Sequence, residues 1–374
     1  MKRIYLDNAA TTAMDPLVLE AMMPYLTEQF GNPSSIYSYG RESRLAIENA
    51  RKSVAKSLNV TPGEIFFTSG GTESDNMAIY SAVHDLGCRV IIASPIEHHA
   101  VLHAAERQVK DGFAELKMVR VLSSGHIDLD HLNQLLEETK EKCLVTLMHA
   151  NNEIGNLLDL NAVADRCLAH GAIFHSDTVQ TVGHYKLDFS HPGIHFATGA
   201  GHKFHGPKGI GILYISKDVQ VRPMIEGGGQ ERNMRAGTEN LYGVVGFAKA
   251  LELAESRLEQ DRIAIQELKS YLIGRLKDRG DVVFNGDVEG QSLYTVLNAS
   301  FPRTPETEML LMNLDMRGIC VSGGSACSSG ADLGSHVIRA LGNSADRVPV
   351  RFSFCRHNTK DELDQVLEAL KSCC

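Results

Sequence analysis

Alternation of two kinds of segment is the feature that most constrains this 374-residue chain. Between Pro16 and about residue 250, short runs rich in β-branched and aromatic residues are separated by stretches with helical periodicity. The runs are EIFFT, RVIIAS, LKMVRV, LVTLMHA, AIFHSD, IHFATG and GIGILYI. Strands that alternate with helices form a mostly parallel sheet covered by helices, so we predict an α/β fold with a seven-stranded sheet.

The last third of the chain shows a different order of helical and strand-like segments. A long stretch with helical periodicity, residues 241–280, leads to the strand-like runs VVFNG, YTVLNASF, GICVS and VPVRFSF and to a final helical stretch. This pattern indicates an α+β unit. We therefore predict a large domain over residues 13–257 and a smaller one built from residues 1–12 and 258–374.

Composition and charge narrow the class of partner. The formal net charge is -9, whereas binding to nucleic acid or anionic lipid requires clustered Lys and Arg. No apolar stretch reaches the ~18–20 residues of a membrane span, and the start, MKRIYLDNAATT, turns polar before it reaches signal-peptide length. The 8 cysteines form no CxxC pairs, which favours free thiols in a reducing compartment. We expect a cytoplasmic protein that acts on small molecules, not on nucleic acid or membranes.

The segment EIFFTSGGTESDNMAIY predicts a phosphate site. It reads as strand, glycine turn and helix, with Gly70 and Gly71 allowing close backbone approach and with Thr72 or Ser74 supplying a hydroxyl at the helix start. The positive end of a helix attracts phosphate. A capped helix after a tight turn is the plain structural alternative, and the absence of GxxxxGKS speaks against a Walker-type loop.

Two successive predicted strands end near a carboxylate and a lysine. Asp177 and Gln180 follow one strand and Lys203 follows the next, so they can meet at the carboxyl edge of the sheet, where open α/β sheets bind ligands. Pyridoxal phosphate needs a Schiff-base lysine, a carboxylate for its ring nitrogen and a phosphate cradle. Lys208 is the competing lysine, but it lies beside Pro207 and leads into the following strand.

A thiol lies in a segment of small residues. Cys327, in VSGGSACSSGADLG, falls between a predicted strand and a predicted helix, where a mobile nucleophile can be presented. An inert surface thiol is the alternative, and the tail cysteines Cys373 and Cys374 receive no role. His99 and His103 have i,i+4 spacing but lack the Glu of HExxH and a third ligand, so we expect no metal site.

Ten motifs occur together: YLDNAATT, FGNPSSIYSYGR, FTSGGTESDN, EHHAVL, HANNEIG, HSDTVQ, GHKFHGPKG, RAGTEN, GSACSSG and VRFSFCR. In these motifs the chain resembles the cysteine desulfurases of the iron–sulfur-cluster and nitrogenase type. The resemblance implies the type I fold of pyridoxal-phosphate transferases and conversion of L-cysteine to L-alanine, with the sulfur passed to an acceptor protein. An aminotransferase or selenocysteine lyase of the same fold, and a sulfur-transfer scaffold with little turnover, are the alternatives.

The resemblance also implies roles for single residues. Lys203 would form the Schiff base and act as catalytic base, His98 would stack on the cofactor ring and manage the substrate thiol proton, and Cys327 would take the sulfur as a persulfide. Asn152 and Arg356 would bind the substrate carboxylate. The other contacts to pyridoxal 5'-phosphate would come from Gly71, Thr72, Asp177, Gln180, His202 and Thr238, the last from the second subunit of a homodimer.

Two positions depart from the family pattern. Ala200 stands where the family commonly has a phosphate-binding serine, and Cys355 replaces the usual glycine of the last motif. Neither change removes a catalytic group. The loss of a hydroxyl at Ala200 predicts looser cofactor binding.

Overall fold

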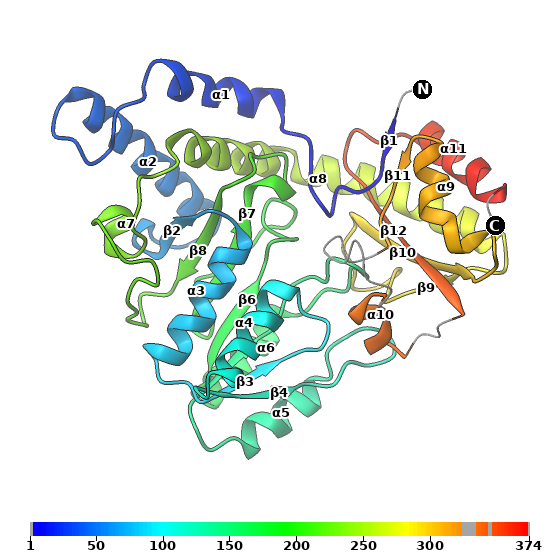
Figure 1. Cartoon of the computed structure of the whole chain (residues 1–374), viewed down its shortest axis with the longest axis horizontal. Helices are drawn as coiled ribbons and strands as arrows, with labels where there is room; N and C mark the ends of the chain where they lie inside the picture. The colour runs from blue at the N-terminus through cyan, green and yellow to red at the C-terminus, as the bar shows by residue number, and fades with distance from the viewer. Residues whose placement is uncertain (1–2, 324–333, 343–345, 373–374) are drawn as a thin grey trace.

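A seven-stranded sheet forms the centre of the larger part of the molecule (Figure 1). The computed structural model describes residues 3–323, 334–342 and 346–372. The strands are β2 (Ile65–Thr68), β3 (Val90–Ala93), β4 (Glu115–Met118), β5 (Cys143–Thr146), β6 (Ile173–Asp177), β7 (Phe196–Ala200) and β8 (Gly211–Ile215). Their order is β2-β8-β7-β6-β5-β3-β4, in which β8 is antiparallel to β2 and β7 and the other neighbours are parallel. The predicted mostly parallel sheet and α/β class are confirmed.

Helices cover both faces of this sheet. Along β3, Ile91 belongs to a core under two helices, whereas its neighbours Val90 and Ile92 belong to the core on the other face. Because both faces are buried, the strands read as continuous apolar runs. The first core includes α3 (Gly71–His84) and α4 (His99–Lys110), and the second includes α1 (Pro16–Thr27), α2 (Ser38–Ser57), α5 (Leu129–Glu138) and α6 (Leu160–Ala169).

The smaller part has its own antiparallel sheet. β10 (Val296–Pro302) lies between β9 (Val283–Phe284) and β12 (Arg347–Ser353). A separate parallel pair joins β1 (Ile4–Tyr5) to β11 (Ile319–Cys320), so the start of the chain pairs with its last third. The remaining short elements are η1 (Pro62–Glu64), η2 (Gly201–Lys203), α7 (Gln230–Asn233), η3 (Thr307–Met309), α9 (Leu310–Met316), α10 (His336–Ala340) and α11 (Lys360–Lys371).

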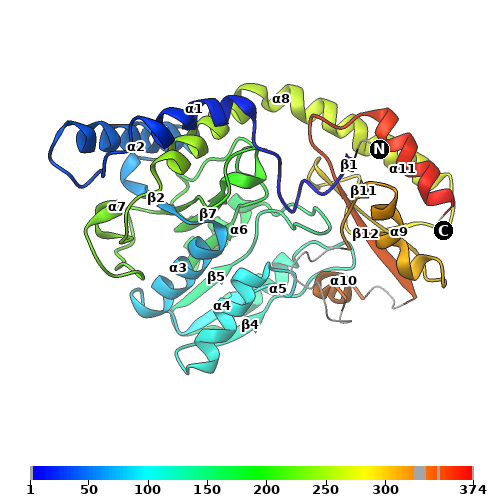
Figure 2. The ribbon, with the colours of Figure 1, turned by 45° about the horizontal axis from the view of Figure 1, so that its top comes forward.

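A single long helix, α8 (Leu241–Lys277), runs through both parts, and Figure 2 shows it passing from α1 and α2 toward α11. Its first half buries Val244 and Phe247 in the core of the large sheet. Its second half buries Leu268 and Leu272 in the core of the smaller part. The predicted boundary between residues 257 and 258 falls inside this helix, and the two-domain division stays a prediction. Among the described residues, no helix is both long and apolar enough to cross a membrane.

Candidate active site

A cavity of about 260 Å³ lies where β6 and β7 end. Asp177 is the last residue of β6, and Lys203 closes the short helix η2 that follows β7 directly. The carboxyl ends of these strands bring residues far apart in the sequence to one site. Eight of the residues predicted from the sequence line it: Gly71, Thr72, His98, Asn152, Asp177, Gln180, His202 and Lys203.

One end of the cavity is formed by the start of α3. The N-cap residue is Gly70, which has no side chain to cap the helix, so the first backbone N–H groups of α3 are available to an anion. A Cβ at Gly71 would lie 2.7 Å from Val179 Cγ2, which explains the glycine. Thr72 is exposed in the cavity wall, whereas Ser74 is buried and its hydroxyl lies 2.7 Å from Thr68 Oγ1. Thr72 is therefore the hydroxyl that faces this end.

Asp177 and Lys203 line the middle of the cavity. Asp177 Oδ1 accepts a hydrogen bond from Val179 N at 2.9 Å, and burial raises the pKa of Asp177 to about 6. Lys203 Nζ donates to the backbone oxygens of Ala9 at 2.6 Å and Ala10 at 2.9 Å. The N-terminal segment thus lies against the lysine. Gln180 lies against the same segment, because its Nε2 donates to Ala9 O at 3.1 Å.

Two histidines of the cavity have lowered pKa values. His98 is the N-cap of α4, and its Nδ1 accepts a hydrogen bond from Ala100 N at 3.1 Å. In the neutral ring this leaves the proton on Nε2. Burial lowers the pKa of His98, and burial together with Lys203 lowers the pKa of His202 to about 4. Both rings are therefore neutral near pH 7.

The two arginines of the VRFSFCR motif lie in different places. Arg351, on β12, is buried in the cavity wall, and its Nη1 donates to Asn152 O at 2.8 Å. Arg356 lines an adjoining cavity of about 30 Å³, which shares Ala9, Gln180 and Lys203 with the larger one. Its Nη2 donates to Asp15 Oδ2 at 2.6 Å. Arg356 is thus held by a carboxylate away from Asn152. The structure thus places Arg351, and not Arg356, in the wall of the cavity that Asn152 lines, whereas the resemblance implied Arg356.

Of the remaining residues named from the sequence, two lie away from this cavity, one lines it, one lines the smaller cavity, and three fall outside the described residues. Thr238 is exposed between α7 and α8, and Lys208 is also exposed, so neither lines the cavity. Cys327 lies outside the described residues, as do Cys373 and Cys374. Ala200 lines the cavity, and Cys355 is a buried thiol in the wall of the smaller one.

Sequence reasoning missed four polar residues of the cavity wall. Asp75 follows Thr72 by three residues on α3, so the helical repeat places both on one face, a signal that could have found it. Arg351 lies in the VRFSFCR motif, which does not show by itself which of its two arginines lines the cavity. Glu153 and His336 have no local signal, since His336 reaches the cavity from the start of α10.

The histidine pair considered for metal binding is stacked. The ring centroids of His99 and His103 lie 4.8 Å apart, and His336 lies 4.6 Å from His99. Within residues 3–323, 334–342 and 346–372, no group of three or more His, Cys, Asp or Glu side chains is arranged to hold a metal ion.

Known proteins resemble this chain over nearly its full length. The model of the aminotransferase class-V family matches residues 4–366. The cysteine desulfurase IscS of Dictyoglomus turgidum is 42% identical over 377 residues, covering 99% of this chain and 94% of the relative. A solved NifS-like protein has a TM-score of 0.90 at 37% identity, with 99% and 98% of the two chains covered. The structure of SspA in complex with cysteine has a TM-score of 0.82 at 29% identity, with 95% and 100% covered. This chain belongs to the aminotransferase class-V family and, within it, to the cysteine desulfurases.

Proposed function

We propose that this protein is a pyridoxal-phosphate-dependent enzyme that converts L-cysteine to L-alanine and captures the sulfur as a persulfide on Cys327. The observation that carries the proposal is that Lys203 and Asp177 line the same cavity as the uncapped start of α3. A lysine, a carboxylate and an anion site in one cavity are the set that this cofactor requires. The family membership supports the same reaction.

The residues present fit pyridoxal phosphate. The start of α3 and Thr72 would hold the phosphate, because N–H groups and a hydroxyl converge there. Asp177 would pair with the ring nitrogen, Gln180 with the ring hydroxyl, and Lys203 Nζ with the aldehyde carbon. When bound, the cofactor withdraws electrons from Cα of an amino acid joined to it.

Lys203 has two tasks in this proposal. Its Nζ would hold the cofactor, and as a free amine the same Nζ would accept the proton from the substrate Cα. Hydrogen bonds to Ala9 O and Ala10 O keep Nζ in the cavity. His98, neutral and with its Nε2 proton, lies on the same cavity and can exchange the thiol proton of the substrate.

We propose Arg351 and Asn152 as the binding site of the substrate carboxylate. A guanidinium matches a carboxylate with two parallel hydrogen bonds, and a buried cation attracts an anion more strongly than an exposed one. Arg351 is 1% exposed and lines the cavity together with Asn152. This replaces Arg356 in the role that the resemblance implied for it.

Sulfur transfer is assigned to Cys327. Its thiolate forms a bond to the sulfur of the substrate while the Cβ–S bond breaks, and the electron pair of that bond stays on Cβ. A proton then completes the methyl group of alanine. The enzyme keeps the sulfur as a persulfide, which an acceptor protein of the sulfur-cofactor or iron–sulfur-cluster pathway removes by thiol exchange.

The decisive experiment compares the full-length wild type with Cys327→Ala. The purified proteins are reconstituted with pyridoxal phosphate, and L-cysteine and a thiol reductant are added. We expect equal visible cofactor bands, with equimolar alanine and sulfide formed by the wild type alone. Retained activity in Cys327→Ala, or no cofactor band after reconstitution, would contradict the proposal. A parallel assay with L-selenocysteine separates a selenocysteine lyase from a desulfurase.

We further propose a homodimer in which Thr238 serves the cavity of the other subunit. Thr238 is exposed and does not line the cavity of its own chain. Large apolar side chains on and between α1 and α2 are also exposed, among them Phe30 and Ile36, the latter at 87%. Thiols without disulfides suit a reducing cytoplasm: the described free cysteines are Cys88, Cys143, Cys167, Cys320 and Cys355.

Mixed dimers test this arrangement. Subunits carrying Lys203→Ala are combined with subunits carrying Thr238→Val, so that each mixed dimer has one cavity with an intact lysine and an intact threonine from its neighbour. We expect mixing to restore cofactor binding in that cavity. Sedimentation as a monomer, or no gain on mixing, would contradict the proposal.

A further inference from the structure

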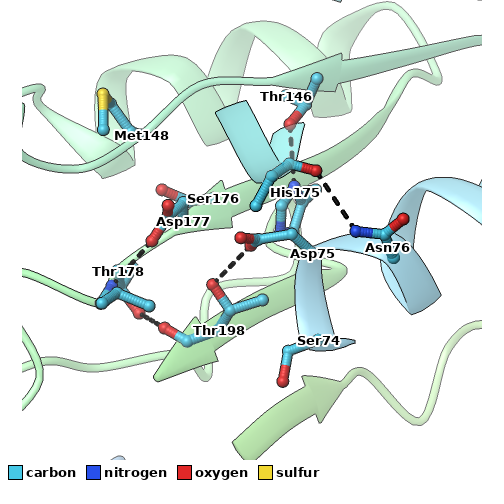
Figure 3. A network of polar contacts seen from close by, with 12 residues as sticks. Ser74, Asp75, Asn76, Thr146, Met148, His175, Ser176, Asp177, Thr178 and Thr198 are labelled. Carbon is cyan, nitrogen blue, oxygen red and sulfur yellow. Dashed lines mark hydrogen bonds and ion pairs between the residues drawn. The ribbon is translucent and has the colours of Figure 1, made fainter. Parts of the chain in front are cut away.

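A second buried carboxyl, Asp75, lines the same cavity as Asp177 (Figure 3). Its side chain is 1% exposed, and its Oδ1 accepts a hydrogen bond from Thr198 Oγ1 at 2.9 Å. The same oxygen lies 3.5 Å from Nε2 of His175, a fully buried ring. On the far side of the ring, Nδ1 lies 2.8 Å from Thr146 Oγ1. The proposed reaction gives Asp75 and His175 no role.

Strand register explains why these groups meet. His175 and Asp177 are two residues apart on β6, so they point to the same face of the sheet. The register pairs His175 with Thr146 on β5 and Asp177 with Thr198 on β7, which puts all four side chains on that face. Helix α3 packs over β6 and β7 and brings Asp75 to them. The helix whose start would hold the phosphate thus also places the carboxyl of Asp75 next to His175 and Thr198.

Two carboxylates in one desolvated site repel one another. Burial raises the pKa of Asp75 to about 7 and that of Asp177 to about 6, and a negative charge on Asp75 contributes to the raised pKa of Asp177. Asp177 has the better environment for a charge, because Val179 N donates a hydrogen bond to it and its pKa is raised less than that of Asp75. Asp75 is therefore the group that keeps a proton.

His175 is able to accept a hydrogen bond from protonated Asp75. Its Nε2 has no hydrogen-bond partner among the described residues, and burial lowers the pKa of the ring to about 4, so the ring is neutral. The neutral ring can donate from Nδ1 to Thr146 and accept at Nε2. The titratable groups that face Asp75 from neighbouring elements are Glu97, His98, His175, Asp177 and Lys203.

We propose that Asp75 is a positioning residue that keeps its proton to a higher pH than Asp177, held between His175 and Thr198, so that Asp177 carries the negative charge that pairs with the cofactor ring nitrogen. This inference rests on the proposed function, because it assumes that Asp177 pairs with the ring nitrogen. With Asp75 neutral, the single negative charge of Asp177 balances the single positive charge of a protonated ring nitrogen. A charged Asp75 would instead drive Asp177 to bind a proton and lose that pair.

Two matched substitutions separate the carboxyls. Asp75→Asn keeps a neutral polar group of the same shape, so the dissociation constant for pyridoxal phosphate should stay within about threefold of the wild type. Asp177→Asn removes the charge and should weaken binding by about tenfold or more. Both are measured by absorption titration of the full-length protein freed of cofactor. Asp85→Asn, at the other end of α3, is the control and should leave the dissociation constant unchanged, because Asp85 binds Arg222 and does not line the cavity.

Each outcome of this titration decides something. If Asp75→Asn loses as much affinity as Asp177→Asn, the charge on Asp75 is needed and this inference is overturned while the proposed function stands. If Asp177→Asn binds normally, or the wild type takes up no cofactor, the proposed function fails and this inference fails with it.

Stability against pH gives a readout without cofactor. A buried carboxyl with a raised pKa binds its proton more tightly in the folded chain, so stability falls as pH rises from the unfolded value near 4 through about 7. Asp75→Asn has no carboxyl to lose a proton, so its stability should not fall in this way. Its urea midpoint should therefore rise relative to that of the wild type as the pH increases from about 4 to about 7. A midpoint that falls relative to the wild type would reveal an ionised Asp75 paired with a protonated His175.

A second variant keeps the test valid if Asp75→Asn does not fold. Thr198→Val removes the hydroxyl that donates to Asp75 and favours its charged form. The pKa of Asp75 should rise further, so the pH-dependent loss of stability should move to higher pH with cofactor affinity unchanged. A shift to lower pH would overturn the inference.

Discussion

Arg351 Nη1 donates a hydrogen bond to the backbone oxygen of Asn152 at 2.8 Å, and Arg351 Nη2 donates to Asp7 Oδ1 at 2.7 Å. The second contact neutralises part of the charge, and Asp7 belongs to the segment that follows β1. One buried guanidinium thus ties the N-terminal segment to the cavity wall and still lines the cavity itself. It is the cation best placed for a substrate carboxylate.

Arg351→Lys should raise KM for L-cysteine and lower kcat/KM by about a hundredfold. A lysine keeps the charge but cannot form two parallel hydrogen bonds to a carboxylate. Steady-state kinetics of alanine formation measure the change, with thermal unfolding as the check on folding. Arg356→Lys is the matched control and should leave KM unchanged, because Arg356 does not line the cavity that holds Asn152. A higher KM in Arg356→Lys alone would restore the assignment of Arg356.

Ala200→Ser should tighten cofactor binding by about tenfold, or roughly 1–2 kcal/mol. The Cβ of Ala200 lies 3.9 Å from where a Cβ on Gly71 would stand, so a hydroxyl there reaches the phosphate end of the cavity. Equilibrium titration with pyridoxal phosphate measures the gain. Ala200→Val adds bulk without a donor and should not tighten binding; an equal gain in both variants would mean that packing, not the hydroxyl, is responsible.

The α/β architecture could be predicted from the sequence because the patterns that indicate its strands and helices are local and occur many times. The run of β3 is apolar throughout and that of β5 is apolar up to Thr146, as is typical of strands buried on both faces, and the intervening stretches have helical spacing. The pairing of β1 with β11 could not be predicted, because a strand of two residues is too short to show a periodic pattern. Their partner choice depends on the packing of α8, α9 and α11 around them.

The part of the candidate site that lies at strand ends could be predicted from the sequence. Asp177 and Lys203 follow neighbouring strands, so their convergence follows from the rule for parallel sheets. Arg351 was missed because a motif with two arginines does not show which one faces the cavity; the pairing of Arg351 with Asn298 across β12 and β10 decides that. Asp75 was missed because a polar residue on a helix is ordinarily solvated, and only tertiary packing buries it.

Cofactor affinity should fall as pH drops below about 6. The pKa of Asp177 is raised to about 6, so the carboxylate that pairs with the ring nitrogen becomes protonated below that value and loses its charge. Titrations from pH 5 to 8 measure the effect. The cofactor phosphate also titrates near 6, so the ratio of wild-type to Asp177→Asn affinities isolates the carboxyl. A ratio independent of pH would contradict this prediction.

Glu231→Gln should lower the free energy of unfolding by about 3 kcal/mol. Both carboxylate oxygens accept hydrogen bonds from Arg51 at 2.8 Å, and Phe67 N donates to one of them. The pair is buried, so a neutral amide removes the buried counter-charge of Arg51 and leaves its guanidinium with the less buried Glu48, whose Oε1 lies 3.1 Å from Arg51 Nε. Urea unfolding at pH 7 measures the loss.

The same substitution should also loosen the segment that leads to Thr238. Glu231, Arg232 and Asn233 have φ values of 45°, 56° and 65°, a left-handed conformation that non-glycine residues adopt at a cost of about 1 kcal/mol or more each. The ion pair to Arg51 compensates for that strain, so losing it should weaken dimer formation as well as stability. Glu252→Gln, which breaks an exposed pair with Lys249, is the control and should change stability by less than about 0.5 kcal/mol. Equal losses in the two variants would show that burial does not decide the strength of the Arg51 pair.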